Sequence, residues 1–155
     1  MTVHRFNIHL ASSDDIESLI ELDSVSRCDS RRRAFIENAV TAAQCWIATG
    51  NDEVALTVGY GILNRTFFEQ NFVPLIVVRD TARRTGVGIA LLSEFESQCQ
   101  GTKLFTSTNT SNVPMRALLL RCGFVESGYI DNLDDGDPEL IFVKRAAIRR
   151  KNSAV

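Results

Sequence analysis

Residues 77–89 have the sequence VVRDTARRTGVGI and are the most informative part of this chain. They follow directly on an apolar run, Leu75–Val78, which is typical of a strand covered on both faces. A turn with Arg83 and Arg84 comes next, and Gly86-Val87-Gly88 then begins an apolar helix. The first N–H groups of a helix have no intrahelical acceptor and carry a positive potential. The stretch therefore predicts a strand, a basic turn and a helix start that binds a phosphate group.

Two other phosphate-binding motifs do not fit this stretch. A Walker loop needs a lysine directly after its last glycine, and Ile89 stands there. A dinucleotide fingerprint needs glycine or alanine three residues after the second glycine, where Leu91 stands, and no carboxylate follows about 20 residues later. A nucleotide-binding module is therefore a weaker hypothesis. A glycine pair that only makes a tight turn is the other alternative.

Hydrophobic periodicity and turn residues predict the other elements. Strands are expected at residues 3–10, 45–49, 54–63, 67–78, 104–107, 125–130 and 140–143. Helices are expected to begin at Ser12 or Ser13 and to cover residues 31–43, 86–99 and 112–121. The inward residues of the second and third helices are expected to be Phe35, Ile36, Ala39 and Val40, and Leu91, Leu92, Phe95 and Cys99. Strands that first form hairpins and then alternate with helices predict a mixed α/β sheet.

Length and composition are those of one globular domain with 155 residues, 45% hydrophobic and 23% charged. We expect residues 1–145 to form this domain and residues 146–155 to form a basic, flexible tail. No apolar run approaches the roughly 20 residues of a membrane span, and acidic residues in the first thirty argue against a secretory signal. The net charge of −2 disfavours a nucleic-acid binder. A cytoplasmic protein without membrane or nucleic-acid partners is expected.

The cysteines predict no metal site. Cys28, Cys45, Cys99 and Cys122 show no C-x-x-C spacing, and the two histidines, His4 and His9, lie near the N-terminus. A zinc site needs clustered thiolates or imidazoles. We expect four reduced, mostly buried cysteines.

Two motifs in register resemble the GNAT superfamily of acyl-CoA-dependent N-acyltransferases. Residues 83–88, RRTGVG, match its Q/R-x-x-G-x-G/A signature. Residues 109–112, NTSN, followed by Arg116-Ala117 and Cys122-Gly123-Phe124, are similar to its second motif, in which an Asn begins a helix that ends in Gly-Phe. Residues 128–140 resemble the C-terminal part of a group of small bacterial members. The resemblance covers essentially the whole chain.

The resemblance implies a fold and a co-substrate. The fold is a single domain with a mixed, mostly antiparallel sheet of about seven strands, a central splayed parallel pair and about four helices. Acetyl-CoA would bind with its pantetheine on the backbone of Ile76, Val77 and Val78, and Asn112 would contact this arm. Its pyrophosphate would lie on the amides of residues 84–89, next to Arg83. The residues implied to bind the pyrophosphate are Arg83, Arg84, Thr85, Gly86, Val87, Gly88 and Ile89. Pro74, which lacks a ladder donor, is expected at a bulge of the strand.

The sequence departs from the family at the general acid. Many members place a tyrosine seven residues after the motif Asn, and here that position is Leu119. Leu119 shares i, i+3, i+4, i+7 spacing with Met115, Leu118 and Cys122, which predicts a core residue. Tyr129 is the substitute to consider, with a buried packing role and protonation by solvent as the alternatives. Glu69 is the nearest carboxylate for a general base, and a solvated turn residue is its alternative.

An acidic segment between the last two expected strands is a candidate acceptor-binding loop. It carries Asp131, Asp134, Asp135, Asp137 and Glu139 without a basic residue, and we assign Asp131, Asp134 and Asp135 to substrate binding. Such charges attract a cationic amine, although Asp-Gly-Asp-Pro is also ordinary turn chemistry.

The resemblance thus implies an acetyl-CoA-dependent N-acetyltransferase. Its acceptor would be a small-molecule or peptide amine, and the backbone N–H of Val78 would stabilise the oxyanion. A non-catalytic acyl-CoA-binding sensor is the alternative from another class. Whether the chain forms a homodimer is left open.

Overall fold

The computed structural model describes residues 5–148, which divide into two compact units. The first unit contains residues 5–64 and 73–92, and the second contains residues 65–72 and 93–148. The start of the strand expected at residues 3–10 and most of the tail expected at residues 146–155 lie outside the described residues.

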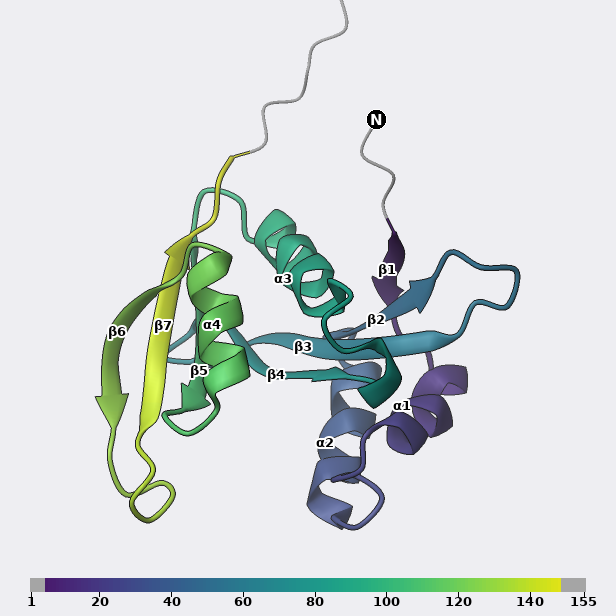
Figure 1. Cartoon of the computed structure of the whole chain (residues 1–155), viewed down its shortest axis with the longest axis horizontal. Coiled ribbons are helices and arrows are strands. Elements are labelled where there is room, and N and C mark those ends of the chain that lie inside the picture. The colour runs from purple at the N-terminus through teal and green to yellow at the C-terminus, as the bar shows by residue number, and fades with distance from the viewer. Residues whose placement is uncertain (1–4, 149–155) are drawn as a thin grey trace, which may run out of the picture. The chain divides into compact units, whose positions relative to one another are not determined.

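The first unit contains four strands, the helices α1 and α2 and the first part of α3 (Figure 1). Its elements are β1 (Phe6–Leu10), a 3-10 turn η1 (Ser13–Asp15), α1 (Ile16–Leu22), α2 (Ser30–Thr41), β2 (Cys45–Gly50), β3 (Thr57–Phe67), β4 (Gln70–Val78), a 3-10 turn η2 (Asp80–Ala82) and the start of α3 (Val87–Gln98). Local capping sets the helix starts. The backbone N–H of Ser12 donates to the carboxylate of Asp15 over 2.7 Å, and Asp29 accepts from the N–H of Arg31 over 2.9 Å.

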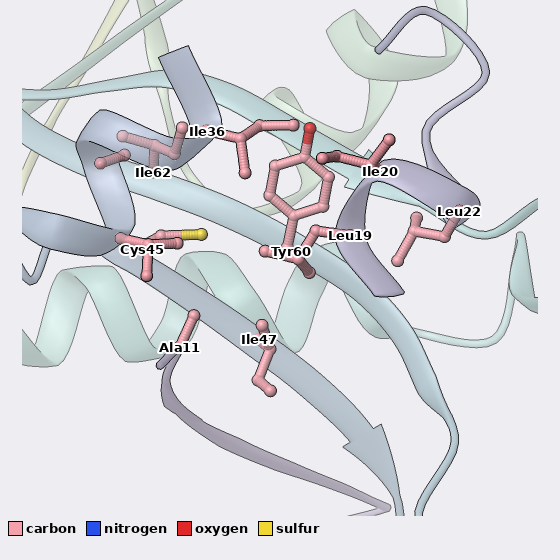
Figure 2. Packing of buried hydrophobic residues seen from close by; sticks show 11 residues of the cluster. Ala11, Leu19, Ile20, Leu22, Ile36, Cys45, Ile47, Tyr60 and Ile62 are labelled. Carbon is pink, nitrogen blue, oxygen red and sulfur yellow. The ribbon is translucent and has the colours of Figure 1, made fainter. Parts of the chain in front are cut away.

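The core of the first unit lies between α1, α2 and the strands β2 and β3. Figure 2 shows the ring of Tyr60 among Leu19, Ile20 and Ile36, all from this cluster. The prediction for α2 is wrong at one residue, because Phe35 is 38% exposed. The buried stripe of α2 consists of Ile36, Ala39 and Val40. Phe35 lies about 100° around the helix from Ile36, which places it at the edge of this stripe.

The second unit is built on three strands with α4 and the rest of α3 (Figure 1). They are β5 (Lys103–Asn109), β6 (Val125–Ile130) and β7 (Glu139–Arg145), and α4 covers Val113–Arg121. The strand β7 pairs antiparallel with β5 and with β6, and the β6 register shifts between Glu126 and Tyr129. Asn112 caps α4 by accepting from the N–H of Met115 over 3.3 Å. Leu119 is fully buried, so its predicted core role is confirmed.

The strand expected at residues 67–78 is shorter than predicted. Phe67 ends β3, and β4 begins only at Gln70. Phe68 and Glu69 form the turn between them with φ of 49° and 60°. Two positive φ values are typical of a type I′ hairpin turn, which usually contains glycine or asparagine, and neither residue type stands at these two positions. Aromatic packing stabilises the hairpin instead. Phe67 stacks on Phe72 with ring centroids 5.1 Å apart, and the ring centroid of Phe105 lies 5.5 Å from that of Phe67.

Hydrogen-bonded strands follow the order β1-β2-β3-β4-β5-β7-β6. The neighbours β4 and β5 are joined through a helix, a crossover that makes them parallel, while the described pairs β1–β2, β2–β3, β5–β7 and β6–β7 are antiparallel. The predicted α/β class with seven strands in a mixed sheet and four α-helices is confirmed for residues 5–148. The bulge expected near Pro74 and the splay expected beyond it stay predictions.

Candidate functional site

The end of β4 directs half of its backbone groups away from β3. The N–H of Arg79 donates to the carbonyl of Val58 over 2.8 Å, so it points toward β3. Because successive residues of a strand alternate in direction, the N–H groups of Ile76 and Val78 point to the other edge of β4. Residues 76–78 are each half-buried. A ligand that lies along this edge would therefore find donors from Ile76 and Val78.

A glycine allows β3 to approach the end of β4 and the start of α3. A Cβ atom at Gly59 would lie 2.8 Å from Val87 Cγ1 and 2.9 Å from the carbonyl oxygen of Val77. Real Cβ atoms essentially never come this close to such neighbours. Gly59 thus fixes the packing of the strand end against the helix start.

The loop from β4 to α3 turns sharply through two residues in the left-handed region. Arg84 has φ of 61° and Gly86 has φ of 97°. A non-glycine residue with positive φ is uncommon and often marks a functional segment. The loop is anchored at its start, where Arg79 donates to the carbonyl of Thr57 over 3.0 Å and pairs with Glu21 over 3.0 Å. That pairing lowers the pKa of Glu21, chiefly through the hydrogen bond from Arg79.

The start of α3 offers a row of backbone donors that have no acceptor among residues 5–148. The first hydrogen bond into the helix runs from the N–H of Ala90 to the carbonyl of Gly86 over 3.0 Å. The N–H groups of residues 86–89 therefore precede the first helical acceptor. Arg83 and Arg84 are exposed beside them, and Arg83 pairs with Asp80 over 3.0 Å. Donors, dipole and guanidinium groups together fit an anion of the size of a phosphate.

A pocket of about 300 Å³ adjoins this strand end within the first unit. It is bordered by the segment after α1, by α2 and by the C-terminal half of β4. Its lining residues are Leu22, Asp23, Ser24, Val25, Arg32, Leu75, Ile76, Val77, Val78, Asp80 and Arg83. Four of the residues predicted from the sequence, 76–78 and Arg83, thus lie at one pocket.

A buried polar cluster forms part of the pocket wall. Asp23 is 2% exposed, and its Oδ2 accepts from the hydroxyl of Tyr60 over 2.6 Å and from Nη1 of Arg32 over 3.1 Å. Its Oδ1 accepts from the N–H of Val25 over 3.0 Å. Burial, and then the carboxylate of Asp23, raise the pKa of Tyr60 far above its ordinary value, so Tyr60 stays a neutral donor.

The sequence analysis did not identify this cluster. Asp23 follows a helix, Arg32 lies inside the next one, and Tyr60 belongs to a central strand. No motif spacing connects these three positions, and they meet only through the packing of α1 and α2 on β3. A tyrosine on the buried face of a strand, which needs a partner for its hydroxyl, was the one available signal.

The candidate residues of the second unit, Tyr129, Asn112 and Glu69, are all exposed. Tyr129 is 65% exposed on β6, so the alternative of a buried packing role is wrong. Asn112 is exposed and uses its Oδ1 in the helix cap, which leaves its amide nitrogen for other partners. Glu69 is exposed in the turn before β4, whereas Val78 ends that strand.

Hydrogen bonds fix part of the acidic loop. Asp134 accepts from the side chain of Asn109 over 2.7 Å, and Asp137 accepts from the N–H of Ser111 over 3.0 Å. Asp131 and Asp135 are exposed and make no hydrogen bond or ion pair with the part of the chain that the structure covers. Asp134 therefore helps to hold the loop, and Asp131 and Asp135 are its available carboxylates.

Metal-binding and membrane-spanning features are not found between residues 5 and 148. No three His, Cys, Asp or Glu side chains of this part lie close enough together to hold a metal ion. No helix of this part has the length and apolar character that crossing a bilayer requires. Of the four cysteines, Cys45 and Cys99 are buried, Cys122 is half-buried and Cys28 is exposed, and all four are free thiols.

Comparison with known proteins identifies the family. Residues 13–124 match the family model described as the acetyltransferase (GNAT) family. This chain belongs to the GNAT family. No curated protein sequence matches it significantly. The predicted GNAT resemblance is confirmed.

Solved structures of the GNAT family agree. A GNAT-family acetyltransferase from Bacillus cereus ATCC 10987 is 34% identical, with a TM-score of 0.82 over 93% of this chain and 99% of that chain. YncA, a putative acetyltransferase from Salmonella typhimurium solved with acetyl-CoA, is 14% identical, with a TM-score of 0.70 over 98% of this chain and 100% of that chain. NAA60 from Arabidopsis thaliana, solved with a bisubstrate analogue, is 17% identical, with a TM-score of 0.70 over 90% and 97%. The last two show similarity of fold.

Proposed function

We propose that this GNAT-family protein is a cytoplasmic N-acetyltransferase that transfers the acetyl group of acetyl-CoA to a primary amine. The observation that carries the proposal is the row of uncommitted N–H groups at the start of α3, beside a strand end with outward donors. Together with family membership, it supports acetyl-CoA as the donor substrate. An acetyl-CoA complex of the fold relative YncA supports the same co-substrate.

The donor substrate would be held by backbone groups more than by side chains. The backbone of Ile76, Val77 and Val78 would bind the pantetheine arm as an additional strand. The amides of residues 84–89, with Thr85, Gly86, Val87, Gly88 and Ile89 among them, would bind the pyrophosphate, and Arg83 and Arg84 would add charge. Asn112 would contact the arm through its amide nitrogen. The positive φ of Arg84 supports this assignment, because it brings successive N–H groups to one side of the loop.

Acetyl transfer would follow direct attack of the neutral amine on the thioester carbonyl. The outward N–H of Val78 would donate to the oxygen that becomes negative, and a donor fixed in a strand needs no reorganisation. Most of the acceleration would come from this donor and from alignment of the two substrates. The CoA thiol has a pKa near that of cysteine, so the thiolate leaves without strict need for an acid.

Proton transfer has two candidate side chains, Tyr129 as an acid and Glu69 as a base. The exposed phenol of Tyr129 is accessible to a substrate and is the candidate general acid. Glu69 lies a full strand length from Val78, which gives a role as general base no geometric support. A base reached through water, or solvent itself, would then take the proton of the amine.

The acceptor would be a small-molecule or peptide amine. The available carboxylates of Asp131 and Asp135, with Asp134 fixed by Asn109, would attract its positive charge before it reaches the thioester. The burial of Leu119, where many members have a catalytic tyrosine, favours one other function: an acyl-CoA-binding sensor without turnover. Release of CoA with an amine distinguishes the enzyme from the sensor.

Titration calorimetry with acetyl-CoA, followed by measurement of CoA release over a panel of amines, tests the proposal. We expect Gly86→Asp to abolish acetyl-CoA binding, because it places a carboxylate and a strained side chain where the pyrophosphate would lie. Arg83→Ala is expected to weaken binding less, since the backbone donors remain. Gly128→Asp is the matched control, because Gly128 has a similar φ of 107° and open space around it. Equal affinity of wild type and Gly86→Asp would refute the assignment of the phosphate site.

A further inference from the structure

The pocket beside β4 adjoins the place proposed for the thioester. Residues 76–78 line it and also supply the backbone groups proposed to bind the pantetheine arm. Whatever fills the pocket therefore lies next to the reacting carbonyl. Its volume of about 300 Å³ is at the lower end of ligand pockets, which run from roughly 300 to 1,000 Å³. The size favours an acceptor as small as an amino acid.

Arg32 lines this pocket, and its guanidinium group is bound to protein at one nitrogen. Its Nη1 donates to Asp23 and the guanidinium also interacts with the nearby hydroxyl of Tyr60, whereas Nε and Nη2 make no hydrogen bond that meets distance and angle criteria between residues 5 and 148. These two nitrogens carry the parallel N–H groups that bind a carboxylate in bidentate fashion. The side chain of Arg32 is 26% exposed, so part of it is accessible although the side chain is largely surrounded by protein.

The rest of the cluster holds Arg32 in this orientation. Asp23 has its two oxygens occupied by Tyr60, Arg32 and the N–H of Val25, so it is bound by three donors and fixed in place. Tyr60 is fully buried and cannot reach solvent. The second guanidinium at the pocket, that of Arg83, pairs with Asp80 through Nη2 and is proposed above to add charge for the pyrophosphate. Arg32 is therefore the pocket cation that the proposed donor site does not use.

We propose that the acceptor amine also carries a carboxylate, and that Arg32 binds this carboxylate while the amine faces the thioester. The inference rests on the proposed acetyl transfer and names its substrate class: a small amino acid or a related amino-carboxylate, in place of a polyamine or a protein chain. Asp23 and Tyr60 are positioning residues, because they act on the acceptor through Arg32. A simple salt bridge that only joins the segment after α1 to α2 is the alternative.

The test compares acids with their amides in the presence of acetyl-CoA. The panel contains glycine, β-alanine, γ-aminobutyrate and the common L-amino acids, each also as its carboxamide, with spermidine and a lysine peptide as other amine classes. We expect at least one amino acid to be acetylated with kcat/KM about 10- to 100-fold above that of its amide, the effect of hydrogen bonds to a charged group. Calorimetry with the N-acetylated acid and its amide gives the same comparison without turnover.

Variants separate recognition from structure. In Arg32→Gln the ratio of acid to amide should fall to about one, and Arg32→Lys should keep part of it, while the affinity for acetyl-CoA stays unchanged. Arg31→Gln is the matched control on the same helix, because the side chain of Arg31 is 93% exposed and does not line the pocket. A purely structural salt bridge would lower the melting temperature of Arg32→Gln and reduce acid and amide rates equally, which would overturn the inference.

The remaining outcomes are also decisive. Acetyl-CoA binding with acetylation only of spermidine, of the peptide or of no amine overturns the inference and leaves the donor site standing. Absence of acetyl-CoA binding overturns the proposed function and the inference together.

Discussion

Gly59→Ala tests the close approach that builds the site. The new methyl group would lie about 0.6 Å too close to Val87 and about 0.5 Å too close to the carbonyl of Val77, since ordinary contact begins at 3.4 Å. Overpacking of this kind costs about 1–3 kcal/mol. Replacing glycine by alanine in a permitted conformation returns about 0.4–1 kcal/mol through the unfolded chain. We therefore expect a net destabilisation of about 1–2 kcal/mol.

Two measurements check this expectation. The melting temperature should fall by about 2–8 °C for a chain of this size. Acetyl-CoA affinity should fall about 3- to 10-fold, which corresponds to the loss of about one hydrogen bond. The reason is that the neighbours that must move, the end of β4 and the first residue of α3, belong to the proposed acetyl-CoA site. Gly50→Ala is the matched control, because Gly50 also belongs to a strand and a Cβ there would have only Asp52 within 4 Å, at 3.9 Å. This variant should be neutral or slightly stabilising. If Gly59→Ala melts like wild type and binds acetyl-CoA equally well, the site does not depend on this packing.

Two further predictions concern buried side chains. Leu119→Tyr should destabilise the protein by about 1–3 kcal/mol, because Leu119 is fully buried; a stable variant with faster CoA release would show that this position faces the substrate. Burial raises the pKa of the Cys45 thiol from 9.0 to about 12, so the folded state holds this proton more tightly than the unfolded chain. The resulting stability is complete below about pH 9 and is lost as the pH rises toward 12, with about 1.4 kcal/mol gone at pH 10. Urea unfolding at pH 8 and pH 10 measures it, and equal pH dependence in Cys45→Ala would contradict the assignment to this thiol.

The sequence predicted the local features of the site because they depend on residues that are close together. Gly86 and its neighbours specify a sharp turn into α3, and Asn112 and Gly123 mark both ends of α4. Residues 76–78 end the predicted strand, but the structure shows them half-buried at a pocket, whereas the apolar run predicted a strand covered on both faces. The turn at Phe68 and Glu69 lies inside the strand predicted over residues 67–78, because aromatic packing, and not turn chemistry, supports it. Of the expectations for Glu69, the alternative of a solvated turn residue agrees with its place in the structure.

The sequence by itself determined the family, through two motifs that resemble those of the GNAT superfamily. It also determined the mixed sheet and the loop that turns into α3, because these are encoded by short-range periodicity and by glycines at fixed spacing. Only the tertiary structure decided which charged groups meet. Asp23, Arg32 and Tyr60 come together through packing of three separate elements, and Asn109 takes up one carboxylate of the acidic loop. The physical reason is that burial and hydrogen-bond partners depend on long-range contacts, so the same aspartate residues in the sequence become a fixed anchor at one position and an accessible charge at another.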